Sequence, residues 1–345
     1  MRFPLQGNGK MLSFTLRKIA ALVGTMLGIA ALTFLITNVA PGDPARLVAG
    51  PNATEDMVET IRVQNGLDKT LPEQFVVYMN GLLHGDLGTS IVTTRPVLSE
   101  LLRYAPATIE LVLVAMALGV FIGVPLGMLS AVYRNSWFDH VTRIFSISGV
   151  ALPAFWFGIL LQLLFAVQMG WLPVSGRLPL VARPPEPITH FLLVDSLLRG
   201  QFSLFWTALS HIILPAIVLS FPCLASILRV NRAEMVEVLQ SDHVVAARAH
   251  GLSSRRIVAL YALKNAMLPT LAIIGLRFGW MLGSTVLVET VFDWPGIGLY
   301  AVSSALASDF KPVIGVTLLI GFFFIIANTI VDLAYAWIDP RLRNA

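Results

Sequence analysis

Long apolar stretches that are nearly free of charge recur along the chain, and they constrain its fold more than any other feature. They cover residues 19–39, 108–133, 144–169, 208–228, 268–291 and 313–338. Each has about 20 residues or more, the length that an α-helix needs to cross a bilayer at about 1.5 Å per residue. The sequence therefore predicts an all-α, polytopic membrane protein with six transmembrane helices.

The composition supports a membrane protein. Of 345 residues, 56% are hydrophobic and 13% are charged, with a mean hydropathy of +0.76, whereas about 25% of residues are charged in a soluble domain. The 26 glycines and 20 prolines suit membrane helices that pack closely and kink. Because Cys223 is the single cysteine, no intramolecular disulfide can form. The net charge of +4 reflects positive residues beside apolar runs, so we expect no nucleic-acid partner.

The positions of Lys and Arg predict the orientation. With a cytoplasmic N-terminus, the cytoplasmic segments hold 14 of these residues: 1–18, 134–143, 229–264 and 340–345. The segments on the opposite side are longer in total and hold 9: 40–104, 170–207 and 292–312. Because positive residues accumulate on the cytoplasmic side, both termini are predicted to be cytoplasmic.

These assignments divide the chain into a cytoplasmic lead (1–18), a first span (19–39), a periplasmic segment (40–107), a transmembrane core (108–338) and a cytoplasmic tail (339–345). The first span could instead be a cleaved signal peptide, but its apolar run exceeds the usual core of about 7–15 residues. In the periplasmic segment we expect short helices over 54–65 and 72–83. Pro153 is expected to kink the third span.

The segment 229–267, between the fourth and fifth spans, is basic and carries six Lys and Arg residues. Within it, residues 240–249 are predicted to form a short helix that Ser241 caps and Gly251 ends. Its alanines, Ala246, Ala247 and Ala249, would form a surface that another protein can approach closely. A helix this short is marginal alone in water, so it needs a partner surface.

Charged residues inside the predicted spans are the other candidates for function, because charge in a membrane is costly. They are Arg277, Glu110, Glu289 and Asp332. Arg277 lies deepest, about nine residues into its span. Two interpretations stay open for each: a local ion pair or helix-end charge, or a side chain that lines a polar translocation path.

Catalytic and metal sites are not indicated. The six histidines show no metal-ligand spacing, and no nucleophile lies beside an evident base. We therefore expect no catalytic residue, no metal site and no cofactor in this chain.

Two parts of the basic segment, 242–252 (DHVVAARAHGL) and 263–269 (LKNAMLP), resemble the cytoplasmic EAA loop of ABC importer permeases. The likeness is greatest to the branch that serves dipeptides, oligopeptides, glutathione and nickel, and within it to dipeptide permeases. Other segments of the chain fit that branch in the same order: 41–44 (PGDP), 84–88 (HGDLG), 173–176 (PVSG), 289–298 (ETVFDWPGIG) and 339–343 (DPRLR).

This resemblance implies a type I ABC importer permease fold in the bacterial inner membrane. The loop helix would dock on a separate cytoplasmic ATPase that binds ATP and Mg, through Asp242, Val245, Ala246, Ala247, Arg248 and Gly251. The resemblance also implies a homologous second permease subunit, one or two ATPase subunits, a periplasmic or extracellular solute-binding protein, and lipid as partners.

The chain departs from the general EAA pattern at Val245, where an acidic residue is usual, so Asp242 and Arg248 are the nearest polar substitutes. The interval from Gly251 to Leu268 is longer than the generic one, as in the peptide branch. The resemblance implies dipeptides or oligopeptides as substrates, and glutathione, nickel, opines and other small solutes stay open. An ion-gradient-driven secondary transporter and a membrane scaffold are the alternatives from other classes.

Overall fold

The computed structural model describes residues 20, 23–35, 44–49, 53–64 and 68–338, with side chains up to residue 330. In these residues the chain is helical, and its only β-type pairing is an isolated bridge between Thr89 and Pro96. The chain divides into two compact units, one of residues 1–104 and 300–325, the other of residues 105–299 and 326–345. The predicted lead, the tail and the 41–43 and 339–343 motif residues lie outside the described residues.

The first unit contains the predicted periplasmic helices. They are α2 (Pro44–Ala49), α3 (Glu55–Gln64) and α4 (Leu71–Leu83), so the helices predicted over 54–65 and 72–83 are confirmed. The apolar helix Val23–Leu35 lies within the predicted first span. Its Phe34 ring packs on Phe75 and Tyr78 of α4, with centroids 5.2 and 5.6 Å away.

Asp309 anchors the loop that follows α4 in this unit. Its buried carboxylate accepts hydrogen bonds from the Ser90 hydroxyl (2.6 Å) and the Ile91 N–H (2.8 Å). Asp309 directly precedes α14 (Phe310–Ile338). The HGDLG motif turns just before this loop, with Gly85 and Gly88 at positive φ, so the motif and the start of α14 are held together.

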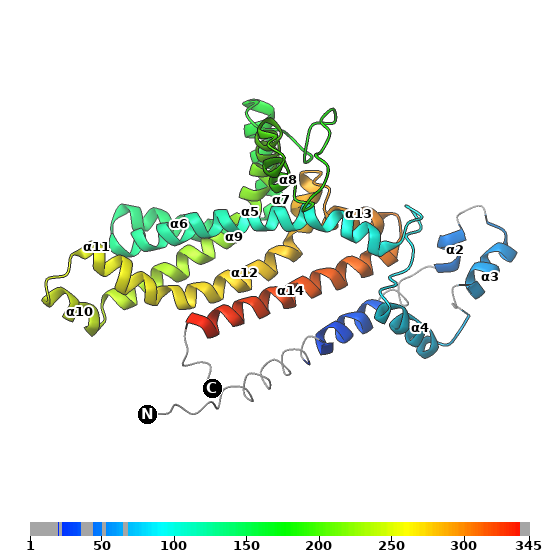
Figure 1. Cartoon of the computed structure of the whole chain (residues 1–345), viewed down its shortest axis with the longest axis horizontal. Coiled ribbons are helices and arrows are strands. Elements are labelled where there is room, and N and C mark those ends of the chain that lie inside the picture. Colours follow the sequence, from blue (N-terminus) through cyan, green and yellow to red (C-terminus); the bar gives the residue numbers. More distant parts are fainter. Residues whose placement is uncertain (1–19, 21–22, 36–43, 50–52, 65–67, 339–345) are drawn as a thin grey trace. The chain divides into compact units, whose positions relative to one another are not determined.

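The second unit is a helical bundle around α9. Its helices are α5 from residue 105 (Val97–Val132 in full), α6 (Trp137–Ala151), α7 (Ala154–Leu161), the π-helix η1 (Gln162–Gln168), α8 (Leu192–Leu198), α9 (Phe202–Leu239), α10 (Asp242–Ala249), α11 (Ser254–Arg256), the π-helix η2 (Ile257–Ala262) and α12 (Leu263–Val291). Figure 1 shows α6, α9 and α12 running side by side, in cyan-green, yellow-green and yellow.

Glycines on α5 and α6 allow these helices to approach α9 at backbone distance. A Cβ at Gly127 of α5 would lie 2.8 Å from the Leu228 carbonyl oxygen, and one at Gly149 of α6 would lie 2.6 Å from the Ala225 Cβ. Close approach at small residues is how membrane helices gain van der Waals contact where lipid supplies no hydrophobic driving force. These glycines therefore hold α5 and α6 close against α9, which α7, α8 and α12 also contact.

Four helices are long and apolar enough to cross a membrane, and the pair Trp137–Ala151 and Ala154–Gln168 makes a fifth span if it is counted as one. The two members of the pair meet at 109°, at Leu152–Pro153, so the kink predicted at Pro153 is confirmed. This search covered the described residues only. The six-span count and the cytoplasmic termini stay predictions.

The helices extend beyond the apolar runs that predicted them. α9 continues to Leu239, and the helix leading into the fifth span starts at Ser254, so much of the basic segment 229–267 is helical. Charged residues such as Arg229 and Arg232 end a lipid-compatible stretch but do not end a helix. Backbone hydrogen bonding continues until a turn residue interrupts it.

Candidate functional site

The predicted loop helix exists as α10, and Figure 1 shows it in the connection between α9 and α11. It runs from Asp242 to Ala249, two residues shorter at its start than predicted. Ser241 occupies the N-cap position, but its hydroxyl donates to the Val238 carbonyl (2.5 Å) and makes no capping bond. The position of the predicted cap is therefore confirmed, but the predicted hydrogen bond is wrong. The Ser241 hydroxyl donates to a carbonyl at the end of α9 instead.

Gly251 ends α10 as predicted, in the left-handed conformation with φ of +76°. The Leu252 N–H donates to the Ala247 carbonyl (3.2 Å) and the Gly251 N–H to the Arg248 carbonyl (2.9 Å). This pair of bonds is the Schellman motif, which satisfies carbonyls that a helix end otherwise leaves unpaired. The glycine thus sets both the end of α10 and the direction of the chain after it.

The faces of α10 differ in burial. Val244 and Ala247 are buried, and they pack with Ile257 of η2 and with Val238, Leu239 and Leu252. Asp242, Val245, Ala246, Arg248 and Ala249 are exposed. The expected outward alanine surface therefore consists of Ala246 and Ala249 only, since Ala247 holds α10 against its own chain.

Glu110, on α5, is buried and engaged locally. Its carboxylate forms an ion pair with Arg177, and it accepts a hydrogen bond from the Leu193 N–H at 2.7 Å. Arg177 lies within the Pro-rich connection between η1 and α8, and Leu193 lies in α8, just after that connection. Glu110 therefore fastens that connection to α5.

Glu289, near the end of α12, is fully buried and caps the next helix. It accepts hydrogen bonds from the N–H groups of Gly298 (2.7 Å) and Leu299 (3.0 Å) and from the Thr108 hydroxyl (2.6 Å). Gly298 and Leu299 lie in the first turn of α13 (Ile297–Leu306), where unpaired N–H groups favour a negative side chain. The Thr108 hydroxyl also accepts from the Ile297 N–H at 2.9 Å.

The glycines of the DWPGIG motif make this cap possible. A Cβ at Gly296 would lie 2.4 Å from the Glu289 carboxylate, and one at Gly298 would lie 2.6 Å from the Val286 Cα. Both contacts are too close for any side chain. Two more hydrogen bonds hold the turn between α12 and α13. The Gly176 N–H of PVSG donates to the Phe292 carbonyl (2.9 Å), and the Trp294 indole N–H donates to the Ala107 carbonyl (3.0 Å).

Arg277 differs from the two glutamates. It is half-buried on α12, with its guanidinium 5.6 Å from the ring centroid of Trp280. In the part of the chain that the structure describes, Arg277 makes no ion pair. Asp332 lies on α14, and its side chain is outside the description.

Four buried carboxylates of the described residues were not singled out from the sequence: Glu100, Asp139, Asp195 and Asp309. Asp139 of α6 forms a bidentate pair with Arg232 of α9. Asp195 of α8 accepts bonds from the Thr189 hydroxyl and from two backbone N–H groups. Burial raises the pKa of Asp195, but the bonds from Thr189 and from the backbone outweigh it and hold the pKa below its ordinary value. All four lie outside the apolar runs, where an acidic residue does not stand out in the sequence.

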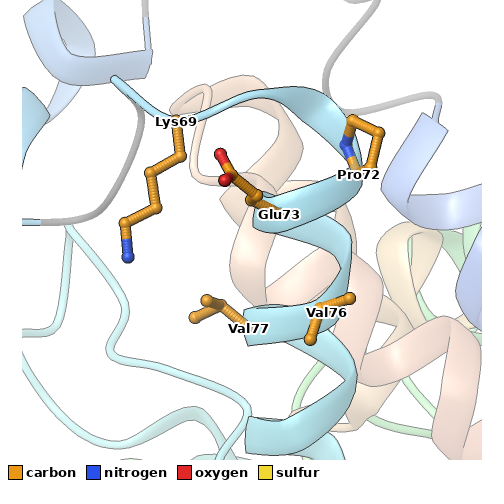
Figure 2. A pocket seen from close by; sticks show the side chains of 5 residues that line it. All are labelled: Lys69, Pro72, Glu73, Val76 and Val77. Atoms are coloured by element: carbon orange, nitrogen blue, oxygen red, sulfur yellow. The ribbon is translucent and has the colours of Figure 1, made fainter.

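An open depression lies on α4 and the turn before it, lined by Lys69, Pro72, Glu73, Val76 and Val77 (Figure 2). The Glu73 carboxylate accepts hydrogen bonds from the backbone N–H (3.0 Å) and hydroxyl (2.9 Å) of Thr70. These bonds, the backbone one first, lower the pKa of Glu73. No residue of the predicted coupling or path sets lines this depression, and its carboxylate already serves to cap α4.

The family was identified by sequence comparison. Residues 123–344 match the family described as binding-protein-dependent transport system inner membrane component, and residues 11–112 match its N-terminal companion. The chain belongs to this family. It is therefore a permease component of a binding-protein-dependent transport system and a multi-pass protein of the bacterial inner membrane, as the resemblance implied.

Similar permeases cover almost the whole chain. The probable D,D-dipeptide transport system permease protein DdpB of Escherichia coli K12 is 47% identical over 93% of this chain and 94% of its own length. The di/tripeptide permease DppB of Pseudomonas aeruginosa is 41% identical over 97% and 99%. The glutathione permease GsiC of Pectobacterium atrosepticum is 38% identical over 96% and 99%.

Proposed function

We propose that this permease is a subunit of an ATP-driven importer of dipeptides. The observation that carries the proposal is similarity of 37–47% identity to dipeptide and di/tripeptide permeases, over at least 93% of the chain. A homologous second permease forms the other half of the path, and a solute-binding protein delivers the peptide. ATP and Mg are bound by one or two ATPase subunits, and this chain has no catalytic site of its own.

The exposed face of α10 is the proposed contact with the ATPase. Val245 is 55% exposed, and Asp242, Ala246 and Arg248 are exposed as well. An aliphatic patch between an acidic and a basic side chain suits a protein cleft, because small residues allow close approach and the charges orient the helix. The buried Val244 and Ala247 support the helix from behind.

Uptake by the purified transporter tests the function. The chain would be purified in mild detergent from its native membrane with the proteins that accompany it, and reconstituted in liposomes. We expect one homologous permease and one or two ATPases to be recovered, and radiolabelled dipeptide to accumulate only with ATP and the binding protein.

Preferential uptake of glutathione would assign the alternative substrate. Uptake driven by an ion gradient without ATP would identify a secondary transporter, and no solute movement would favour a scaffold.

Arg277 is the proposed path residue among the predicted intramembrane charges. Glu110 and Glu289 hold local partners, whereas the Arg277 guanidinium contacts the Trp280 ring. A cation in a span is costly unless it faces protein or water, and a peptide carries a carboxylate that a guanidinium binds well. Arg277 is therefore proposed to contact the substrate carboxylate during passage.

Replacing Arg277 with Gln is expected to lower dipeptide uptake by about tenfold or more, since a hydrogen bond to a charged group contributes about 1.5–3 kcal/mol. Arg277→Lys keeps the charge and is expected to retain an intermediate rate. Initial uptake rates in proteoliposomes, at matched amounts of assembled complex, measure both. Wild-type uptake by the Gln variant would exclude Arg277 from the path.

A further inference from the structure

A buried ion pair joins α6 to α9 near the end of α9 that leads into α10. Arg232 of α9 donates from Nε to one carboxylate oxygen of Asp139 at 2.5 Å and from a terminal nitrogen to the other at 2.8 Å. The Asp139 side chain is fully buried, and that of Arg232 is 18% exposed. Two parallel bonds between planar groups fix orientation as well as distance, so the pair holds α6 in one rotational setting on α9.

The same carboxylate reaches a third helix. Asp139 accepts a hydrogen bond from the Ser130 hydroxyl of α5 at 2.6 Å and from the Asn135 N–H of the α5–α6 turn at 3.0 Å. With the two bonds from Arg232, both carboxylate oxygens are occupied twice. Asp139 is therefore a junction at which the ends of α5, α6 and α9 are fastened together.

The last turns of α9 connect this junction to α10. Met235 is buried with Ala131 of α5 and with Ala262 and Ala266 of η2 and α12. Further along, Val238 and Leu239 pack on the inner face of α10. From Arg232 to Leu239 the chain is continuous helix, about 10 Å long at 1.5 Å per residue. A displacement of α10 therefore acts on a short, packed segment of α9. At the other end of this segment, Arg232 bonds Asp139.

We infer that the Asp139–Arg232 pair is the positioning element that transmits movement of α10 to α5 and α6. The inference rests on the proposed function, in which α10 docks on the ATPase. Packed apolar surfaces can slide and rotate, but a doubly bonded pair with both oxygens engaged passes on rotation as well as translation. Without it, α9 would follow α10 while α5 and α6 lag behind.

The test compares transport with ATP hydrolysis in the reconstituted complex. Asp139→Asn and Arg232→Gln are expected to keep the ATPase subunits bound and ATP hydrolysis active, while the peptide taken up per ATP hydrolysed falls at least tenfold. The double variant is expected to fall no further than the single ones, because both remove one interaction. Arg232→Lys, which keeps the charge without the second bond, is expected to regain part of the ratio.

Arg229→Gln provides the matched control. Arg229 lies on the same helix three residues earlier, carries the same charge and is exposed, so its replacement is expected to leave the ratio unchanged. Ser130→Ala removes one bond to Asp139 without burying a lone charge. It is expected to fold and to lower the ratio by a smaller factor, which tests the inference should the charge variants fail to assemble.

A wild-type ratio in the assembled Asp139→Asn, Arg232→Gln or Ser130→Ala complexes would overturn the inference. So would loss of ATPase binding in the Asp139 and Arg232 variants, because the pair would then shape the α10 surface and not transmit its movement. Lack of ATP-driven uptake by the wild-type complex, in contrast, would refute the proposed function and the inference with it.

Discussion

Replacing Gly251 with Val is expected to lower coupled transport about tenfold or more, while the chain still inserts and assembles with its partner permease. Gly251 has φ of +76°, and a Cβ there would meet nothing within 4 Å. The effect therefore comes from backbone conformation and not from a clash. A left-handed residue with a side chain costs about 1–2 kcal/mol, and β-branching adds to this cost.

That cost is large for α10, because a helix of eight residues has little stability of its own. Each 1.4 kcal/mol lowers the population of the correctly ended helix about tenfold. ATP-dependent uptake is expected to fall by that factor or more, and binding of the ATPase should weaken in parallel. Uptake in proteoliposomes and co-purification of the ATPase measure the two effects.

Gly251→Asn is the matched control, since Asn tolerates the left-handed conformation better than other residues with a side chain. It is expected to retain most of the uptake, with Gly251→Ala between the two. Equal uptake by the Val variant and the wild type would refute a role for the Schellman turn in coupling. Loss of membrane insertion would show that the turn serves folding first.

Replacing Glu289 with Leu is expected to prevent accumulation of folded protein. The change leaves the N–H groups of Gly298 and Leu299 and the hydroxyl of Thr108 without their buried acceptor. Each unmet group costs about 1–3 kcal/mol, which together approaches the whole stability of a typical protein, about 5–15 kcal/mol. The amount of monodisperse protein in detergent is expected to fall below about a tenth of the wild-type amount.

Thr290→Leu is the neighbouring control. Thr290 is exposed, and its hydroxyl donates to the Val286 carbonyl of its own helix at 2.7 Å, so little change is expected. Glu289→Gln keeps one acceptor oxygen and is expected to lie between. Size-exclusion profiles and thermal unfolding in detergent measure the three variants. A Leu variant that folds normally but does not transport would reassign Glu289 from capping α13 to the translocation path.

The two glutamates show the limit of interpreting intramembrane charge from sequence. Glu110 and Glu289 lie at the ends of apolar runs, where a local pair and a path residue look alike. Each has a partner that is distant in the chain: Arg177 is 67 residues from Glu110, and Thr108 is 181 residues from Glu289. For both residues the structure supports the local interpretation, because each carboxylate is buried and bonded.

The α10 segment shows how far local signals reach. The helix and its glycine end were predicted because a positive-φ glycine after a short helix is a property of neighbouring residues. The direction of Ala247 and the bonding of Ser241 were not, because they depend on Ile257 and on the end of α9. The alanine pattern alone could not assign one member to the inner face.

The sequence by itself determined the class of this protein, its apolar helices, the break at Pro153 and the helix ended by Gly251. These features depend on hydrophobic length, proline geometry and glycine conformation, which act within a few residues. Only the tertiary structure decided that Glu289 caps α13, that Glu110 fastens a loop, and that Asp139 joins three helices through Arg232, 93 residues away. The role of a buried charge depends on the hydrogen-bond donors that the fold places beside it. The residues near that charge in the sequence do not indicate which donors these are.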